Sequence, residues 1–117
     1  MLSSLHHVQL AMPTGGEAQA RAFYSALFGL PEVPKPPVLA ARGGLWFEQG
    51  DIRVHLGVEN PFEPAKKAHP AFVVADIDRL ADMLLTAKMR VRWDSDLPDH
   101  RRFYTADPFG NRIEILG

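Results

Sequence analysis

Cysteine is absent from the 117 residues of this chain, which excludes disulfide scaffolds, thiolate zinc sites and cysteine nucleophiles. Any bound metal must therefore be held by histidine and carboxylate. An excess of basic charge is also missing, because 13 Lys and Arg face 14 Asp and Glu for a formal net charge of -1. Binding to a phosphate backbone needs such an excess, so we expect no nucleic-acid partner.

Long apolar runs are missing too, since no stretch approaches the roughly 18 residues that a membrane span requires. The N-terminus, MLSSLHHVQL, has neither the basic start nor the apolar run of a signal peptide. We therefore expect a soluble, cytoplasmic protein with no membrane partner. Hydrophobic residues make up 46% of the chain and charged residues 23%, which is typical of a folded globular domain and not of a disordered one.

The first half of the chain predicts a strand, a helix and three further strands. Residues 5–12 alternate in polarity as a half-buried strand does. Thr14 and Glu17 then have the spacing of a capping box, so a helix should follow and end near Gly29. After a proline-rich loop, the remaining strands are expected over residues 37–41, 44–49 and 51–58.

The second half repeats this plan. Asp76 is a plausible N-cap for a helix that we expect to extend to residue 88. The strands are predicted around this helix, over residues 69–75, 91–93, 102–106 and 112–116.

The two halves align as an internal repeat. Segments beginning at His7 and His69 match at an offset of 62 residues, and segments containing His55 and Glu114 match at an offset of 59. We interpret the chain as one domain, residues 1–117, made of two modules joined by a linker. The predicted parts are module one over about 1–58, the linker over 59–68 and module two over 69–117.

Four ionisable side chains occupy matched positions of this repeat. On the aligned strands the apolar residues share one parity and should face the helices. The opposite parity carries His7, His55, His69 and Glu114. These side chains can converge if the two modules curl around one cleft. Three imidazoles and one carboxylate suit a divalent ion such as Zn, Ni, Mn, Fe or Co, with positions left open for water or substrate.

Three segments resemble the vicinal oxygen chelate superfamily, which includes glyoxalases, bleomycin-resistance proteins and extradiol dioxygenases. They are LHHVQL at residues 5–10, HPAFVVADID at 69–78 and FYTADPFGNRIE at 103–114. The resemblance spans essentially the whole chain, and the last segment is its most specific part. It implies an α+β fold of two paired βαβββ modules that form an open, cup-shaped mixed sheet with helices outside. It also points to a homodimer and to a small-molecule substrate with adjacent oxygens.

Carried over by position, the resemblance implies that His7, His69 and Glu114 are metal ligands and that Glu114 is a candidate catalytic carboxylate. His55 stands where glyoxalase I-like members have Glu, so it is either a fourth ligand or a residue of the pocket wall. With His55 in place of that Glu, the site has one carboxylate fewer and lacks a candidate proton acceptor. This weakens the case for lactoylglutathione lyase activity. The motifs therefore do not distinguish dioxygenase or thiol-transferase chemistry from lyase or isomerase chemistry.

Further residues are candidates for substrate binding. Arg53 and Arg112 have the parity of the proposed ligands and can bind a substrate anion at the rim of the cup, although strand-end surface charge is an alternative explanation. Tyr104 can line the pocket, although core packing explains many such aromatics. A different class of function also stays open, that of a metal-free protein that binds a drug or metabolite, as in bleomycin-resistance proteins. Such a protein needs no aligned His and Glu set.

Overall fold

The structure is a computed structural model that describes all residues, 1–117. The chain divides into two compact units, Met1–Glu63 (unit 1) and Pro64–Gly117 (unit 2). The boundary falls inside the segment 59–68 that the sequence indicates as a linker. Each unit contains one four-stranded sheet.

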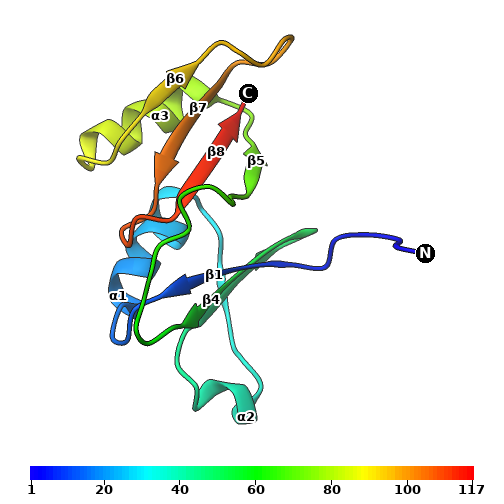
Figure 1. Cartoon of the computed structure of the whole chain (residues 1–117), viewed down its shortest axis with the longest axis vertical. Helices are drawn as coiled ribbons and strands as arrows, with labels where there is room; N and C mark the ends of the chain where they lie inside the picture. The colour runs from blue at the N-terminus through cyan, green and yellow to red at the C-terminus, as the bar shows by residue number, and fades with distance from the viewer. The chain divides into compact units, whose positions relative to one another are not determined.

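Unit 1 builds its sheet in the order β1-β4-β3-β2, with β1 parallel to β4 and the other neighbours antiparallel. Figure 1 labels β1 and β4 of this sheet. The short α-helix α1 continues directly into a π-helix, η1. The elements of unit 1 are β1 (Val8–Met12), α1 (Glu17–Ala20), η1 (Arg21–Leu27), β2 (Glu32–Val33), α2 (Pro37–Ala40), β3 (Leu45–Gln49) and β4 (Ile52–Val58).

One face of this sheet is covered by η1. The ring of Tyr24 stacks on that of Phe47, with the centroids 5.7 Å apart, and both side chains are fully buried with Val54. The opposite parity of β3 and β4 carries Trp46 and His55, which pair across the two strands. The predicted separation of apolar and functional residues onto two faces is therefore present in unit 1.

Unit 2 repeats the plan with the sheet order β5-β8-β7-β6, in which β5 is parallel to β8. Its helix begins at the predicted N-cap, because the Asp76 side chain accepts a hydrogen bond from the Arg79 N–H at 3.0 Å. The elements of unit 2 are β5 (Ala71–Val73), α3 (Ile77–Thr86), β6 (Arg92–Asp94), β7 (Arg102–Ala106) and β8 (Arg112–Leu116).

The core of unit 2 forms between α3 and one face of the sheet. Leu84 of α3 is fully buried, as are Phe103, Ile113 and Ile115 of the strands. Residues of the other parity, such as Tyr104 and Glu114, pair across β7 and β8 on the opposite face. The α+β class and the repeated βαβββ plan are thus confirmed.

Four local predictions are wrong. The proline-rich segment is not all loop, because Glu32–Val33 forms β2 against β3. Residues 37–41 form the helix α2 and not a strand, because Pro37 stands at a first-turn position where its fixed φ favours a helix. The capping box does not form, since the N-cap is Gly16 and no side chain caps the helix. β1 and β5 begin at Val8 and Ala71, so His7 and His69 lie just before the strands. In addition, the structure has no helix with the length and apolar character needed to cross a membrane.

Candidate metal and substrate site

In unit 2, His69 and Glu114 form a close pair of metal-donor groups. Ala71 of β5 pairs with Glu114 of β8, and the Glu114 N–H donates to the Pro70 carbonyl at 3.0 Å. This pairing brings the residue before Pro70 next to the Glu114 side chain. His69 Nε2 lies 2.9 Å from Glu114 Oε1, and the two side chains are 22% and 9% exposed.

The hydrogen bonds of His69 leave its Nε2 facing an acceptor. The Nδ1 lies 2.8 Å from the Lys67 carbonyl oxygen, which only accepts, so Nδ1 carries a hydrogen. In a neutral ring, Nε2 then has a lone pair that points at a carboxylate oxygen. A cation between the two atoms makes this contact favourable, and that cation is either a second ring proton or a metal ion.

The geometry of this pair suits a metal. Two ligand atoms that each lie about 2.1 Å from one ion, at a right angle, are roughly 3 Å apart, which is close to the observed 2.9 Å. A carbonyl that accepts from the second ring nitrogen is also usual for metal-binding histidine, because it sets the tautomer and the ring orientation. The donor chemistry of His69 and Glu114 therefore fits a divalent ion.

Arg102 occupies the second oxygen of Glu114. Its Nη1 donates to Glu114 Oε2 at 3.1 Å, while its Nε and Nη2 donate to Asp94 Oδ1 at 3.0 and 2.9 Å. Burial alone raises the pKa of Glu114, but the hydrogen bonds from His69 and Arg102 outweigh it and bring that pKa below its ordinary value. Glu114 is therefore ionised at neutral pH, as a metal ligand must be.

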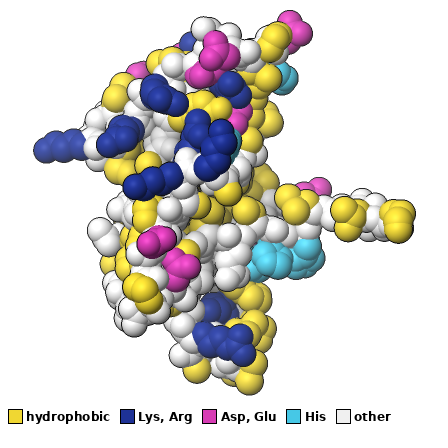
Figure 2. All heavy atoms as spheres, viewed as in Figure 1, with side chains coloured by type: hydrophobic (Ala, Val, Ile, Leu, Met, Phe, Trp, Pro, Cys, Tyr) yellow, Lys and Arg dark blue, Asp and Glu magenta, His cyan; other side chains and the backbone are white.

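In unit 1, His7 and His55 form the corresponding pair, but their rings are stacked. The centroids lie 4.4 Å apart with an interplanar angle of 20°, and Trp46 stacks on His55 with a centroid distance of 4.2 Å. His55 is 3% exposed, whereas His7 is exposed. In Figure 2, His side chains form a patch beside the N-terminal segment.

Stacked rings do not aim at one ion. The lone pair of an imidazole nitrogen lies in the plane of the ring, so two parallel rings direct their lone pairs side by side. One ring has to turn before both can bind the same metal. His7 is exposed and precedes β1, whereas His55 is buried and held from the side, so His7 is the ring that is free to turn.

Glu48 holds His55 in place. Its Oε2 lies 2.8 Å from His55 Nε2, so that nitrogen donates and Nδ1 remains available for a metal. Burial lowers the pKa of His55, and the hydrogen bond to Glu48 opposes this shift only in part. His55 is therefore neutral at neutral pH, which is the form that binds metal.

The sequence reasoning missed Glu48, although its parity on the strand 44–49 matches that of Trp46 and places it on the face of His55. Its carboxylate lies next to the His55 imidazole. Glu114 is therefore not the only carboxylate near the candidate residues, because Glu48 is a second one. Neither unit by itself gathers three His, Asp or Glu side chains into a metal-binding cluster.

The candidate substrate-binding residues separate into two places. In unit 2, the Tyr104 ring lies 5.5 Å from the His69 ring, and the guanidinium of Arg112 lies 4.1 Å from the Tyr104 centroid. In unit 1, Arg53 Nη1 donates to the His6 carbonyl at 3.1 Å, and its Nε lies 4.0 Å from Glu48 Oε1. Arg53 therefore ties the N-terminal segment to β4.

Comparison with known proteins gives a consistent result. A family model described as a glyoxalase-like domain matches residues 9–116. A protein from Bacillus anthracis, described as a candidate glyoxalase family protein, is 48% identical, with a TM-score of 0.94 over 99% of this chain and 95% of that one. No curated protein matches.

Two more distant structures share the fold. The fosfomycin resistance protein FosX from Listeria monocytogenes is 15% identical, with a TM-score of 0.79 over 99% of this chain and 93% of its own. A lactoylglutathione lyase from Agrobacterium tumefaciens is 21% identical, with a TM-score of 0.75 over 98% of this chain and 93% of its own.

Proposed function

Since this chain belongs to the glyoxalase-like domain family, we propose that it is a metal-dependent enzyme that acts on a small molecule with adjacent oxygen atoms. The similarity to the vicinal oxygen chelate superfamily is confirmed by the family match and by the solved structures. The observation that carries the proposal is the contact between His69 Nε2 and Glu114 Oε1, which places an imidazole nitrogen and a carboxylate oxygen, both metal-donor atoms, 2.9 Å apart.

The proposed metal ligands are His69 and Glu114 from unit 2 and His7 and His55 from unit 1. The second pair comes either from the same chain or from a second copy in a homodimer. The ion is divalent, and Zn, Ni, Mn, Fe and Co all suit imidazole and carboxylate donors. When bound, it supplies a Lewis acid that polarises oxygen atoms of the substrate.

The side chains around the ligands have separate proposed roles. Glu114 is the catalytic carboxylate, because an ionised carboxyl can accept a substrate proton. Arg112 and Tyr104 bind the substrate beside His69, because the three side chains lie in one contiguous group. Arg53 binds the substrate from the side of unit 1.

Metal binding is tested by thermal melting. A ligand that binds the folded protein only, at a hundredfold excess over its Kd, adds about 2.7 kcal/mol of stability, which raises the Tm by several degrees. Zn, Ni, Mn and Co are compared in the wild type and in His69→Ala. Glu32→Gln is the control, because Glu32 pairs with Arg21 on the surface and not with the site.

Two results would contradict the proposal: no metal raises the Tm of the wild type, or His69→Ala responds to metal as strongly as the wild type. Either of them favours the metal-free binding protein. Metal analysis of protein purified without an affinity tag provides an independent check.

Reaction type is tested with three substrate classes that match the superfamily's chemistries. The loaded protein is assayed for isomerisation of a glutathione hemithioacetal, for thiol addition to an epoxide and for ring cleavage of a catechol with dioxygen. Glu114→Gln should abolish whichever activity appears. Turnover that persists unchanged in Glu114→Gln would remove Glu114 from the catalytic role.

We also propose a homodimer. β1 and β5 are edge strands of their sheets, and unpaired edges are commonly covered by association. Val73 of β5 is 76% exposed, and Leu2 and Leu5 of the N-terminal segment are 101% and 80% exposed. Light scattering at micromolar concentration should give twice the chain mass, and a stable monomer would contradict this.

A further inference from the structure

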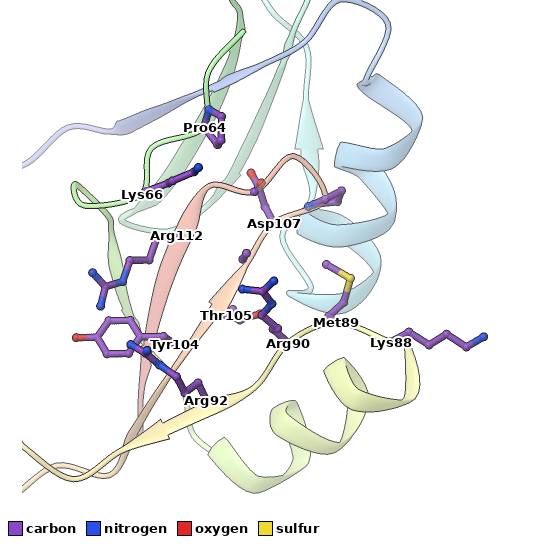
Figure 3. Close-up of a pocket in the computed structure, with 13 residues that line it drawn as sticks. Pro64, Lys66, Lys88, Met89, Arg90, Arg92, Tyr104, Thr105, Asp107 and Arg112 are labelled. Carbon is purple, nitrogen blue, oxygen red and sulfur yellow. The ribbon is translucent and has the colours of Figure 1, made fainter.

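Unit 2 contains a groove that the metal-donor residues do not form. Its volume is about 840 Å³, which lies within the range of small-molecule sites. One wall is the segment around Lys66, and the other is the segment after α3, around Arg90. The floor comes from β7 and the start of β8, including Tyr104 and Arg112 (Figure 3).

Specific local contacts hold both walls in place. The Arg112 N–H donates to the Ala65 carbonyl at 2.9 Å, and the Ala65 N–H donates to Asn111 Oδ1 at 2.9 Å. On the other side, Lys88 follows the C-cap of α3 with a φ of 61°, and the Met89 N–H donates back to the Leu84 carbonyl at 2.8 Å. The groove is therefore built by ordered backbone.

Its lining is strongly basic although the chain as a whole carries a net charge of -1. Lys66, Arg90, Arg92 and Arg112 line the groove, whereas Lys88 points away from them in Figure 3. Figure 2 shows Lys and Arg side chains gathered over this part of unit 2.

None of these four cations makes an ion pair, whereas Arg21, Arg101 and Arg102 elsewhere in the chain each do. The guanidinium groups of Arg92 and Arg112 instead lie 5.6 and 4.1 Å from the centroid of the same Tyr104 ring. Asp94 interacts electrostatically with Arg92, but the four like charges still repel one another, and a bound anion relieves that repulsion.

The one carboxylate in the lining belongs to the turn between β7 and β8. Asp107 is buried, and its Oδ1 accepts from the backbone N–H groups of Phe109 and Asn111 at 2.9 Å each. Its Oδ2 accepts from Asn111 Nδ2 at 2.9 Å. The charge of Asp107 thus serves the turn between β7 and β8.

A buried hydroxyl adds a second, independent observation. Thr105 also lines the groove, is 4% exposed, and its Oγ1 is the buried side-chain polar atom that has no hydrogen-bond partner in the protein. Such groups are rare in folded proteins, because an unsatisfied buried hydroxyl costs free energy. Thr105 pairs with the buried Ile113, so its side chain lies on the α3 face of β7. A ligand oxygen or a bound water that enters beside Arg90 would satisfy this hydroxyl.

We propose that this groove binds a small organic anion with at least two negatively charged oxyanion groups. Guanidinium groups suit phosphate and carboxylate alike, because both offer two oxygens to the planar fork. Tyr104 contacts both the groove and His69, so the anion lies next to the proposed metal ligands. That the groove binds an anion does not depend on the proposed function. That this anion is the substrate of the enzyme does depend on it.

The test measures binding by calorimetry at constant ionic strength. The full chain is freed of metal with a chelator, and the chelator is then removed by gel filtration. Inorganic diphosphate and citrate are the probes, because one carries phosphoryl groups and the other carboxylates. Both should bind saturably at one site per chain, and the tighter of the two identifies the chemistry of the natural ligand.

Three variants distinguish a built site from general surface charge. Arg90→Gln and Arg112→Gln should each weaken binding about tenfold or more, because each removes a charged hydrogen-bond donor. Arg79→Gln is the matched control, since Arg79 is an exposed cation of the same unit outside the groove, and it should change the affinity less than about twofold.

Thr105→Val keeps the shape and the charge of the groove and removes the hydroxyl, so it should weaken binding about three- to tenfold. Thr105→Ser keeps the hydroxyl and should bind nearly as the wild type does. Melting of each variant confirms that it is folded.

Absence of saturable binding, or equal losses of affinity in Arg79→Gln and Arg90→Gln, would contradict the proposal that the groove binds an anion. Equal affinities in Thr105→Val and the wild type would overturn the contact with the hydroxyl. Because the protein is metal-free, failure of the proposed metal site leaves these results unchanged.

Discussion

The two units use the same strand positions for their donor residues but prepare them differently. In unit 2, one imidazole nitrogen faces one carboxylate oxygen, with His69 Nε2 2.9 Å from Glu114 Oε1. In unit 1, the rings of His7 and His55 lie face to face at 4.4 Å. A duplicated fold therefore places equivalent residues alike, while the neighbours of each side chain decide whether it is ready to bind an ion.

The neighbours explain the difference. In unit 2, the Lys67 carbonyl binds His69 Nδ1, and Arg102 binds Glu114 Oε2. The remaining atoms, His69 Nε2 and Glu114 Oε1, then face each other. In unit 1, Trp46 and Glu48 hold His55 firmly, while His7 precedes β1 and has only the neighbouring ring of His6, at 2.9 Å between the Nδ1 atoms, as a hydrogen-bonding partner. We infer that unit 2 supplies the prearranged half of the donor set.

The largest effect should follow from breaking the prearranged pair. Glu114→Gln keeps the shape of the side chain and removes the charge, and His69→Ala removes the other donor. Each should weaken metal binding more than about a hundredfold, beyond the loss typical of a group that only supports a ligand. Calorimetric titration with Zn or Ni measures this, and Glu32→Gln should leave the affinity unchanged.

The stacked pair should matter less. His7→Ala removes a donor that first has to turn, so we expect a loss of about tenfold, clearly smaller than that of His69→Ala. The same titrations provide the measurement. A loss for His7→Ala that equals the loss for His69→Ala would show that both pairs are equally prepared, and the inferred difference between the units would be wrong.

A smaller effect should come from Glu48, which supports His55 without being a proposed ligand. Glu48→Gln weakens the hydrogen bond that orients the ring, and the loss of affinity should be about tenfold or less. If Glu48→Gln and His55→Ala both bind metal as the wild type does, His55 belongs to the pocket wall. The site would then have three ligands.

Much of this arrangement could be predicted from the sequence, because it depends on periodicity. The alternation of apolar residues places His55 and Glu114 on the faces opposite the buried Val54 and Ile113. The repeat then relates the two strands to each other. Both properties follow from the two-residue period of a strand, so the parity of the candidate residues agrees with the structure.

Other features depend on contacts that a linear pattern does not contain. The stacking of His7 on His55 and the hydrogen bond from His55 to Glu48 join residues through side-chain rotamers and strand register. The groove of unit 2 depends on where the segments around Lys66 and Arg90 return to β7. A basic groove in a chain with a net charge of -1 is invisible to composition, because composition averages over the surface.

The smallest expected effect concerns an ion pair outside the site, and it tests whether the donor pair of unit 2 is special. Arg101 donates to both carboxylate oxygens of Asp78 at 2.8 and 3.0 Å. The hydrogen bond from Arg101 lowers the pKa of Asp78. A carboxyl whose pKa is lower in the folded state stabilises the protein above its unfolded pKa of about 3.9, and this stabilisation disappears as the pH falls through the folded value.

Arg101→Gln should therefore melt slightly below the wild type at pH 7, and the difference should shrink as the pH falls through the folded pKa of Asp78 and vanish once Asp78 is protonated in both states. The effect is small because both side chains are exposed, at 60% and 66%, and salt screens them. The metal affinity of Arg101→Gln should equal that of the wild type, because Arg101 touches neither His69 nor Glu114. Melting curves from pH 2.5 to 7 and one metal titration check both points. A metal affinity that falls with the loss of this distant pair would show that general stability, and not the prearranged contact, governs binding in unit 2.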